Sequence, residues 1–421
     1  MKNILVFPCG SEIALDIYSS VKYSTYFHLI GASSVDDHGQ FVYEDYISGL
    51  PYATDKDFVP ALKRIVKERS VDAIYPAMDL VIPLLKEVED ELGCMVISSS
   101  LETTKICLSK ELTYHTLQHV VRTPRLYSSD EVERYPVFVK PKIGYGAKGT
   151  CKINSRKELD SFIAGKDGLL ICEYLPGEEY TVDCFTDKDG CLLYSAARKR
   201  NRVKDGISVN TFFVEQQEEF EMLAQKINAS VRFRGAWFYQ VKRNRDGELC
   251  LLEIASRLGG SSLLSRAVGV NFALLSLFDA FGYKVSILKN EYKVELDRAL
   301  ESRYKTDIVF DTVYVDYDDC LLLNASKVNT ELVAFLFKCI NEKKRVVLLT
   351  KHIGDLPSEL KKYRIESLFD EVIHIAPEGN KSDYIKEDKA IFIDDSHAER
   401  HAVKTMKHLP VFSPDMIDVL Q

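Results

Sequence analysis

Over the first hundred residues, short apolar runs of strand length alternate with amphipathic stretches of helical length. The runs follow one another in the order NILVF, EIALDIYSSV, FHLIGAS, FVPALKRIVKER and DAIYPA. Alternation of this kind predicts a parallel sheet whose strands are joined by crossover helices. We therefore expect residues 1–100 to form a small, doubly wound α/β domain.

From residue 101 onward the pattern changes to strands separated by turn signals. The runs are PVFVKP, GTCKI, LLICEYL, EYTVDCFTDKDGCLLYSAARKR and AWFYQVKRNRDGELCLLEIAS. The DKDG and NRDGE segments predict tight hairpins, because Asp-Gly tolerates the positive φ of such turns. This pattern favours an α+β domain with antiparallel strands over residues 101–300.

A charged stretch follows, LKNEYKVELDRALESRYKTD, which we expect to be a helix or a linker that leads out of the second domain. Beyond it, strand–helix alternation resumes with TVYVDYDD, TELVAFLFKCINEKK, RVVLLTKH, SLFDEVIHI and KAIFIDDS. The alternation predicts a third domain, of α/β class, over residues 306–421.

With 421 residues and 46% hydrophobic content, the chain has room for roughly two to four domains. Its formal net charge of −8 argues against a nucleic-acid partner, because a phosphate backbone requires surplus Lys and Arg on one face. The ten cysteines have no C-x-x-C pair and no zinc-site spacing, which favours reduced thiols in the cytoplasm. No apolar run is long enough for a signal peptide or a membrane span. Self-association stays open.

The segment YPVFVKPKIGYGAKGTCKI combines a strand end with a basic, glycine-rich loop. Glycines let backbone N–H groups close on phosphate oxygens, and a lysine reaching from the strand neutralises them. A solvated hairpin turn explains such a loop equally well when it stands alone. The candidates for phosphate contacts are Lys140, Lys142, Gly144, Gly146, Lys148 and Gly149.

Strands around this loop supply further candidates. Oxygen ligands on adjacent strands that face a basic loop make a site for Mg²⁺ bridging nucleotide phosphates. The acceptors and cations are Glu173, Glu179, Arg198, Arg200, Arg202, Gln240, Glu253 and Arg257.

In this order the motifs resemble those of the ATP-grasp superfamily, most closely the carboxylase/synthetase branch that includes the large chain of carbamoyl-phosphate synthetase. The resemblance covers residues 1–295 and implies a pre-ATP-grasp Rossmann-like domain, an ATP-grasp domain, and ATP and Mg²⁺ as cofactors. The implied nucleotide contacts are Lys110, Lys140 and the loop residues Gly144, Gly146 and Lys148, with Glu173, Tyr174 and Leu175 at adenine and Glu179 at ribose. The implied metal ligands are Gln240 and Glu253, and Arg257 would orient an acyl phosphate.

The implied chemistry is ATP-dependent joining of a small-molecule carboxylate to an amine. Phosphorylation converts a carboxylate oxygen into a leaving group, and cations such as Arg198 and Arg257 would stabilise the transferring phosphoryl group. One departure from the family pattern Glu-x-Asn-x-Arg stands at Ala255, which cannot ligate a metal unless Ser256, water or substrate compensates. A nucleotide-binding domain without turnover and another phosphoryl-transfer enzyme, such as a kinase, are therefore the alternatives.

Substrate specificity would come from loops of the N-terminal domain. The turn after its first strand lies where parallel sheets bind ligands, although a purely structural turn is an equal alternative. The candidates are Gly10, Ser11, Glu12 and Asp79.

The third domain carries acids at its strand ends. Asp316, Asp318 and Asp319 follow one apolar strand, Thr350 ends the next, and Asp394 with Asp395 follows the last. The carboxyl ends of parallel strands meet at one sheet edge, and crowded carboxylates there imply Mg²⁺. Lys381 could balance the remaining charge, with Lys386 and Lys389 as alternatives.

These motifs resemble the haloacid dehalogenase (HAD) superfamily of phosphatases. The resemblance implies that Asp316 is the nucleophile, Asp318 the general acid/base, Thr350 the phosphate-binding hydroxyl and Lys381 the motif lysine. Asp316, Asp318, Asp394 and Asp395 are the implied metal ligands, and Cys320 stands where the family usually has Thr or Val. The short spacings between Asp318, Thr350 and Lys381 leave no room for a cap domain.

The sequence thus favours a bifunctional enzyme, an ADP-forming carboxylate–amine ligase fused to a capless HAD-like Rossmannoid phosphatase that acts on a phosphorylated metabolite. The alternative is a phosphatase regulated by a degenerate, nucleotide-binding ATP-grasp domain, and Ala255 is the residue that favours it.

Overall fold

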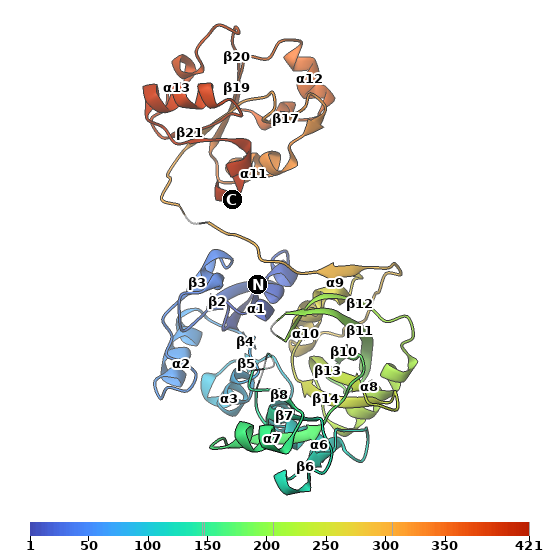
Figure 1. The fold of residues 1–421 in the computed structure, drawn as a ribbon. Coiled ribbons are helices and arrows are strands. Elements are labelled where there is room, and N and C mark those ends of the chain that lie inside the picture. Colours follow the sequence, from blue (N-terminus) through green and yellow to red (C-terminus); the bar gives the residue numbers. More distant parts are fainter. Residues whose placement is uncertain (145, 147, 205, 305, 421) are drawn as a thin grey trace. The chain divides into compact units, whose positions relative to one another are not determined.

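The chain divides after Leu300 into two units, Met1–Leu300 and Glu301–Gln421 (Figure 1). The computed structural model describes residues 1–144, 146, 148–204, 206–304 and 306–420. Within these residues no helix is both long and apolar enough to cross a membrane. The expected boundary at residue 100 lies inside the first unit, and the division into three domains stays a prediction.

The first unit begins with a five-stranded parallel sheet in the order β3-β2-β1-β4-β5. The parallel sheet expected over the first hundred residues is therefore present. The middle strand of this sheet, β1, is buried on both faces, which explains the continuous apolar run NILVF. Its elements are β1 Lys2–Phe7, α1 Glu12–Val21, β2 Phe27–Ala32, η1 His38–Phe41, β3 Asp45–Ile47, α2 Phe58–Glu68, β4 Ala73–Pro76, α3 Val81–Glu87, α4 Glu89–Leu92 and β5 Met95–Val96.

A four-stranded antiparallel sheet follows, in the order β6-β9-β7-β8. Its strands alternate with short helices, of which α6 begins at Lys110 after the N-cap Ser109. The elements are α5 Leu101–Leu108, α6 Lys110–Leu117, β6 Leu126–Tyr127, η2 Ser129–Glu131, β7 Val137–Pro141, β8 Cys151–Ile153, α7 Arg156–Ile163 and β9 Leu169–Glu173.

A six-stranded antiparallel sheet, in the order β14-β13-β10-β11-β12-β15, completes the first unit. The expected hairpins join β10 to β11 and β13 to β14, and Gly190 and Gly247 take positive φ values of 82° and 81° at their turns. The elements are β10 Glu179–Thr186, β11 Leu192–Lys204, β12 Ile207–Phe213, α8 Glu218–Ser230, β13 Gly235–Arg243, β14 Leu249–Ala255, α9 Leu263–Ala267, α10 Phe272–Ala280 and β15 Glu295–Asp297.

The charged stretch after residue 287 is not a helix in the part that the structure describes. Strand β15 pairs instead with the edge strand β12. The Asn210 side-chain amide donates to Glu295 at 2.8 Å and to Asp297 at 3.1 Å, so cross-strand bonds hold these acids. Leu288 and Tyr292 are exposed in this extended segment.

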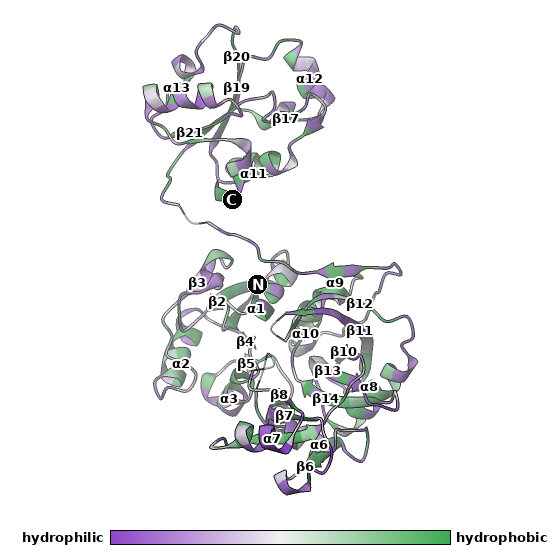
Figure 2. Ribbon diagram, viewed as in Figure 1, coloured by the Kyte–Doolittle hydropathy of each residue, from purple (hydrophilic) through white to green (hydrophobic). Residues whose placement is uncertain are grey.

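The second unit contains a five-stranded parallel sheet in the order β20-β19-β16-β21-β22. Its central strands are buried throughout, and Figure 2 shows hydrophobic residues concentrated in such strands and many hydrophilic ones on α7 and α13. Between β16 and β19 lie only the hairpin β17–β18 and helix α11. The elements are β16 Thr312–Val315, β17 Leu322–Leu323, β18 Lys327–Val328, α11 Thr330–Asn341, β19 Arg345–Thr350, α12 Leu356–Lys362, η3 Glu366–Leu368, β20 Glu371–His374, η4 Lys381–Tyr384, β21 Ala390–Ile393, α13 His397–Lys407, β22 Val411–Phe412 and η5 Pro414–Leu420.

The single tryptophan, Trp237, is buried in the first unit and reports on the unfolding of that unit alone. Leu5 is 0% exposed and Leu300 is 99% exposed, so the two leucines form a matched pair. We expect Leu5→Ala to lower the free energy of unfolding by about 2–5 kcal/mol, because it leaves a cavity, and Leu300→Ala to change it by less than about 0.5 kcal/mol. Urea titration followed by tryptophan fluorescence measures both.

The same signal tests whether the units unfold separately. Leu348 is 0% exposed in the second unit, and Leu348→Ala should leave the fluorescence midpoint in place. A shift as large as that of Leu5→Ala would mean that the two units unfold together.

Candidate functional site

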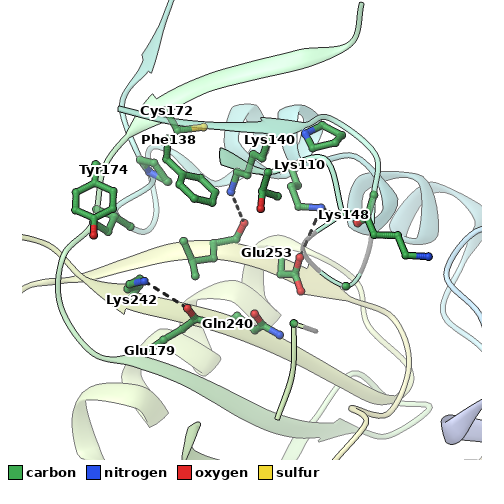
Figure 3. Close-up of a pocket in the computed structure, with 18 of the residues that line it drawn as sticks. Lys110, Phe138, Lys140, Lys148, Cys172, Tyr174, Glu179, Gln240, Lys242 and Glu253 are labelled. Carbon is green, nitrogen blue, oxygen red and sulfur yellow. Dashed lines mark hydrogen bonds and ion pairs between the residues drawn. The ribbon is translucent and has the colours of Figure 1, made fainter. Parts of the chain in front are cut away.

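A cavity of about 380 Å³ in the first unit is lined by both antiparallel sheets (Figure 3). Strands β7 and β9 contribute one wall, and strands β10, β13 and β14 contribute the other. The structure brings together here the residues that the family resemblance assigns to nucleotide or metal in this unit: Lys110, Lys140, Gly144, Gly146, Lys148, Glu173, Tyr174, Leu175, Glu179, Gln240 and Glu253. Three other candidates, Lys142, Gly149 and Arg202, are not among the described residues that line it.

Lys140 is a buried cation in this cavity. Strand β7 carries it, and it is only 6% exposed. Its Nζ donates to the Tyr114 hydroxyl and to the Leu252 carbonyl at 3.4 Å, and it has no ion-pair partner among the described residues. Burial lowers the pKa of Lys140. An anion in the cavity would therefore offset a charge that the chain itself leaves without a carboxylate.

Lys110 connects helix α6, the glycine loop and strand β14. Its Nζ donates to the Gly144 carbonyl at 3.0 Å and lies 3.6 Å from Glu253 Oε2. Its backbone N–H donates to the Lys142 carbonyl at 2.9 Å. The start of the helix is thus fixed to the loop.

At the other end of the cavity, the chain passes from strand β9 to strand β10. The Glu173 backbone N–H donates to the Arg125 carbonyl at 2.8 Å, and Leu175 is buried. The ammonium of Lys152 lies 4.5 Å from the centre of the Tyr174 ring. These contacts hold the segment between the two sheets in place.

Gln240 and Glu253 are direct cross-strand partners on β13 and β14, which places their oxygens on one face. Arg200 donates to Gln240 Oε1 at 3.0 Å and also pairs with Glu179, which lies 3.6 Å from Lys242. A carboxylate and an amide oxygen held side by side fit Mg²⁺, which prefers oxygen ligands.

A second cavity, of about 360 Å³, adjoins the first and extends to the N-terminal sheet. Arg257 lines it and forms a bidentate ion pair with Asp79, at 2.7 and 2.5 Å. Arg198 also lines it, is 2% exposed and pairs with Asp183 at 2.7 Å. Its Nη1 has no hydrogen-bond partner among the described residues. Of the residues that the structure describes, seven line both cavities, namely Lys110, Gly144, Gly146, Arg200, Gly206, Gln240 and Glu253.

A separate cluster of charges lies at the carboxyl edge of the sheet in the second unit. Asp316 follows β16, Thr350 ends β19 and Asp394 follows β21, as the strand order predicts. Lys381 Nζ lies 2.7 Å from Asp316 Oδ1 and 2.6 Å from Asp394 Oδ2. Lys381 is buried, whereas the alternatives Lys386 and Lys389 are exposed.

The electrostatics of this cluster are those of crowded, buried acids. Burial raises the pKa of Asp316 against the pull of Lys381. Burial and the charge of Asp316 raise the pKa of Asp394 to about 6. Asp316 Oδ1 is buried and is paired with Lys381 Nζ at 2.7 Å. Oxygens of Asp316, Asp394 and Asp395 lie within 4.8 Å of one another, so the set fits a divalent cation.

Asp318 lies outside this group of three acids. Its side chain is 50% exposed, and both carboxylate oxygens lie 3.0 Å from His352 Nδ1. Its assignment as a metal ligand stays a prediction.

Comparisons with known proteins concern the ATP-binding motifs. Residues 166–307 match the family model described as ATP-grasp in the biosynthetic pathway with Ter operon. D-alanine–D-alanine ligase from Fusobacterium nucleatum subsp. nucleatum is 26% identical over 194 residues, 42% of this chain. These findings support the ATP-grasp superfamily. The chain spans 65% of the length of that ligase.

Two solved structures have a similar ATP-grasp-like fold. N5-carboxyaminoimidazole synthetase from Staphylococcus aureus, complexed with ADP, has a TM-score of 0.58 and 16% identity, covering 68% of this chain and 78% of that one. The biotin carboxylase domain of 2-oxoglutarate carboxylase from Hydrogenobacter thermophilus, in complex with MgADP, ADP and bicarbonate, has a TM-score of 0.57 and 15% identity, covering 68% and 71%. At these identities the likeness is one of fold.

The sequence assigns Arg198 to the transferring phosphoryl group and includes Arg200 among the candidate cations without a specific role. The structure pairs Arg198 with Asp183 and places Arg200 at the wall that both ATP-grasp cavities share. The signal available was the alternation in ARKRNRVKDG, which puts both residues on one face of β11. That alternation could not decide which arginine meets an acid.

The structure places some of the N-terminal candidates for substrate specificity at a cavity and others away from it. Ser11, Glu12 and Asp79 line the second cavity, whereas Gly10 is not among its described lining residues. A Cβ at Gly10 would meet Asp37 at 2.0 Å, so this glycine is explained by close packing. Ser11 caps helix α1 by accepting from the Ala14 N–H at 3.2 Å.

Ala255 stands where the ATP-grasp pattern has Asn, and Ser256 is the side chain that the sequence offers in its place. Ala255 lines the second cavity, while Ser256 is 5% exposed and lines neither cavity in the described part of the chain. The structure therefore gives no support for Ser256 as a substitute ligand.

The acidic cluster predicts a titration in magnesium-free buffer. We expect Asp394 to bind a proton with a pKa of about 6, above its ordinary value of 3.8. Between these values the folded state binds more protons than the unfolded state, so Asp394 stabilises the second unit at low pH and this contribution is lost as pH rises through 6. Carboxyl ¹³C NMR in EDTA measures the pKa.

Asp394→Asn is the matched control and should remove both the titration and its share of the pH-dependent stability. Lys381→Met should move the Asp394 pKa upward, because it removes the nearest cation. A midpoint near 4 in the unaltered protein would contradict the assignment.

Proposed function

We propose that the first unit is an ADP-forming carboxylate–amine ligase that uses ATP and Mg²⁺. The observation that carries the proposal is the common wall of the two cavities, where Lys110, Arg200 and Glu253 face both. A nucleotide in the first cavity would direct its phosphates toward an acid held in the second. The family match, the relation to a D-alanine–D-alanine ligase and the ADP and MgADP bound in the two similar folds support this arrangement.

The reaction needs charge compensation at the transferring phosphoryl group. A substrate carboxylate oxygen attacks the γ-phosphorus while the bond to the β-phosphate oxygen breaks, which yields an acyl phosphate and ADP. An amine then attacks the acyl carbon, phosphate leaves and the nitrogen loses a proton. Lys110 and Lys140 would bind phosphate oxygens, and Arg257 would orient the acyl phosphate from the second cavity.

Gln240 and Glu253 would hold the magnesium ion in the first unit. When bound, the ion supplies positive charge to the nucleotide phosphates. The cations of the two cavities are also held by protein contacts, for example Arg257 by its ion pair with Asp79. Residues of the second cavity would select the acid and the amine, and Ser11, Glu12 and Asp79 are our candidates for this role.

For the second unit we propose a magnesium-dependent phosphatase of the HAD type. Asp316 would attack phosphorus and form an aspartyl phosphate while Asp318 gives a proton to the departing oxygen. Water, losing a proton to Asp318, would then attack phosphorus and release phosphate and Asp316. Thr350 and Lys381 would bind the phosphoryl oxygens, and Asp316, Asp394 and Asp395 would hold the ion, which screens both anions.

The fusion of the two units suggests consecutive steps, in which one unit makes or consumes a phosphorylated metabolite that the other handles. A second candidate is favoured by Ala255. In this alternative the first unit binds nucleotide without turnover and regulates the phosphatase. Calorimetry separates the two, because a regulator would bind MgATP with no ADP formed under any substrate pair.

The ligase proposal is tested by ADP release from the full chain with ATP, Mg²⁺ and a panel of acid–amine pairs. Release that requires both the acid and the amine supports a ligase. A phosphorylated acid or alcohol formed without an amide would indicate a kinase. No ADP from any pair, together with tight MgATP binding, would favour the regulator.

We expect Lys140→Met to weaken MgADP binding by about 10- to 150-fold, because a charge-assisted hydrogen bond to phosphate is worth about 1.5–3 kcal/mol. Calorimetric titration with MgADP measures the loss. Lys293, whose side chain is 95% exposed, provides the control substitution Lys293→Met, which should bind as the unaltered protein does. Equal affinities for both variants would contradict the placement of the phosphates at Lys140.

We expect Asp316→Asn to abolish hydrolysis of para-nitrophenyl phosphate, because an amide is not a nucleophile toward phosphorus. Asp311 is exposed five residues earlier, and Asp311→Asn should keep full activity. Phosphate release in Mg²⁺ and in EDTA measures both the activity and its dependence on the metal. Activity that survives Asp316→Asn would rule out the aspartyl phosphate.

A further inference from the structure

His352 makes an unassigned contact at the proposed phosphatase site. It lies in the loop that follows β19, and its Nδ1 is 3.0 Å from each carboxylate oxygen of Asp318. Its side chain is 9% exposed, whereas that of Asp318 is 50% exposed. Among the described residues His352 is the only side chain that hydrogen-bonds to the Asp318 carboxylate. A buried ring therefore holds a half-exposed acid.

The side chain and backbone of His352 make several further contacts, while Nε2 is buried without a hydrogen-bond partner among the described residues. The His352 backbone N–H donates to Thr350 Oγ1 at 3.1 Å, and the His352 carbonyl lies 2.7 Å from His374 Nε2. The Tyr317 ring packs edge-on, with ring centres 5.1 Å apart. Nε2 lies 3.8 Å from Glu359, which itself accepts from the Tyr317 hydroxyl at 2.9 Å. The imidazole can thus fix the direction of the Asp318 carboxylate.

We propose that His352 is a positioning residue for Asp318 in the phosphatase reaction, an assignment that rests on the proposed function of the second unit. Nδ1–H donates to the ionised carboxylate, so the contact is made after Asp318 has protonated the departing oxygen. In that half of the cycle Asp318 must receive a proton from the water that attacks the aspartyl phosphate. His352 acts by holding that carboxylate in place.

This role fits the short connections of the unit. Only the hairpin β17–β18 lies between Asp318 and helix α11, and Asp318 is half-exposed. A carboxylate in such an open position has many accessible rotamers, and only a few of them face the phosphorus. A fixed donor from the neighbouring strand end restricts this freedom, and misplacement of a catalytic group by about 1 Å can cost about 100-fold in rate.

The test uses two amide substitutions that differ in the position of their N–H groups. The side-chain nitrogen of Asn can occupy the place of Nδ1, whereas that of Gln extends toward the place of Nε2. With para-nitrophenyl phosphate as substrate and the full chain with Mg²⁺, we expect His352→Gln to lower kcat by about 10- to 100-fold. KM should fall in proportion, so that kcat/KM stays within about threefold, and His352→Asn should recover most of kcat.

In His352→Gln, kcat and KM should fall together because only hydrolysis of the aspartyl phosphate is slowed. The phosphorylated protein therefore accumulates. Acid quenching followed by intact-mass measurement should show a larger phosphorylated fraction in His352→Gln than in His352→Asn. Equal kinetics for the two variants, or a loss of kcat/KM equal to the loss of kcat, would overturn the proposal for His352 alone. An unaltered protein without phosphatase activity would overturn the proposed function of the unit as well.

Discussion

Buried charge that the chain itself does not neutralise is the constraint on which both candidate sites depend. In the first unit the charge is positive: Lys140 is 6% exposed and its hydrogen-bond acceptors are a hydroxyl and a carbonyl. In the second unit it is negative, because Lys381 is the only cation among the described residues that forms ion pairs with Asp316 and Asp394. Burying a charge costs several kcal/mol unless a partner offsets it. A ligand of opposite charge would therefore stabilise each site. The signs are those of a nucleotide phosphate and of a divalent cation.

The two folds bring about this excess of buried charge in different ways. In the first unit a cation on β7 faces acids on another sheet, so that a ligand between the sheets can meet both signs. In the second unit the parallel order of β19, β16 and β21 brings the ends of three strands to one edge. In the second unit the acidic cluster therefore follows from the order of the strands. In the first unit the site depends on how two sheets face each other.

This difference explains what the sequence could predict. Acids after parallel strands are local signals, and Asp316, Thr350 and Asp394 could be grouped from strand order alone, as could Lys140 and its glycine loop from their spacing. Arg200 and His352 could not, because each is selected by a partner distant in sequence: Gln240 is 40 positions away and Asp318 is 34. The sequence left the stretch after residue 287 open as a helix or a linker for the same reason, since the pairing of β15 with β12 is a non-local contact that charge composition does not encode.

The absence of Asn at Ala255 has a limited consequence when the charges around the first cavity are considered together. A second metal ion would add positive charge to the phosphates, and a missing ligand weakens its binding. Lys110, Lys140 and Arg200 already line the cavity from three elements, and each is held by protein contacts before any nucleotide binds. Preorganised cations stabilise a transferring phosphoryl group without reorganisation, and a second metal ion would stabilise it in the same way. In the proposed ligase, a single ion at Gln240 and Glu253 would therefore act on the phosphates together with these side chains.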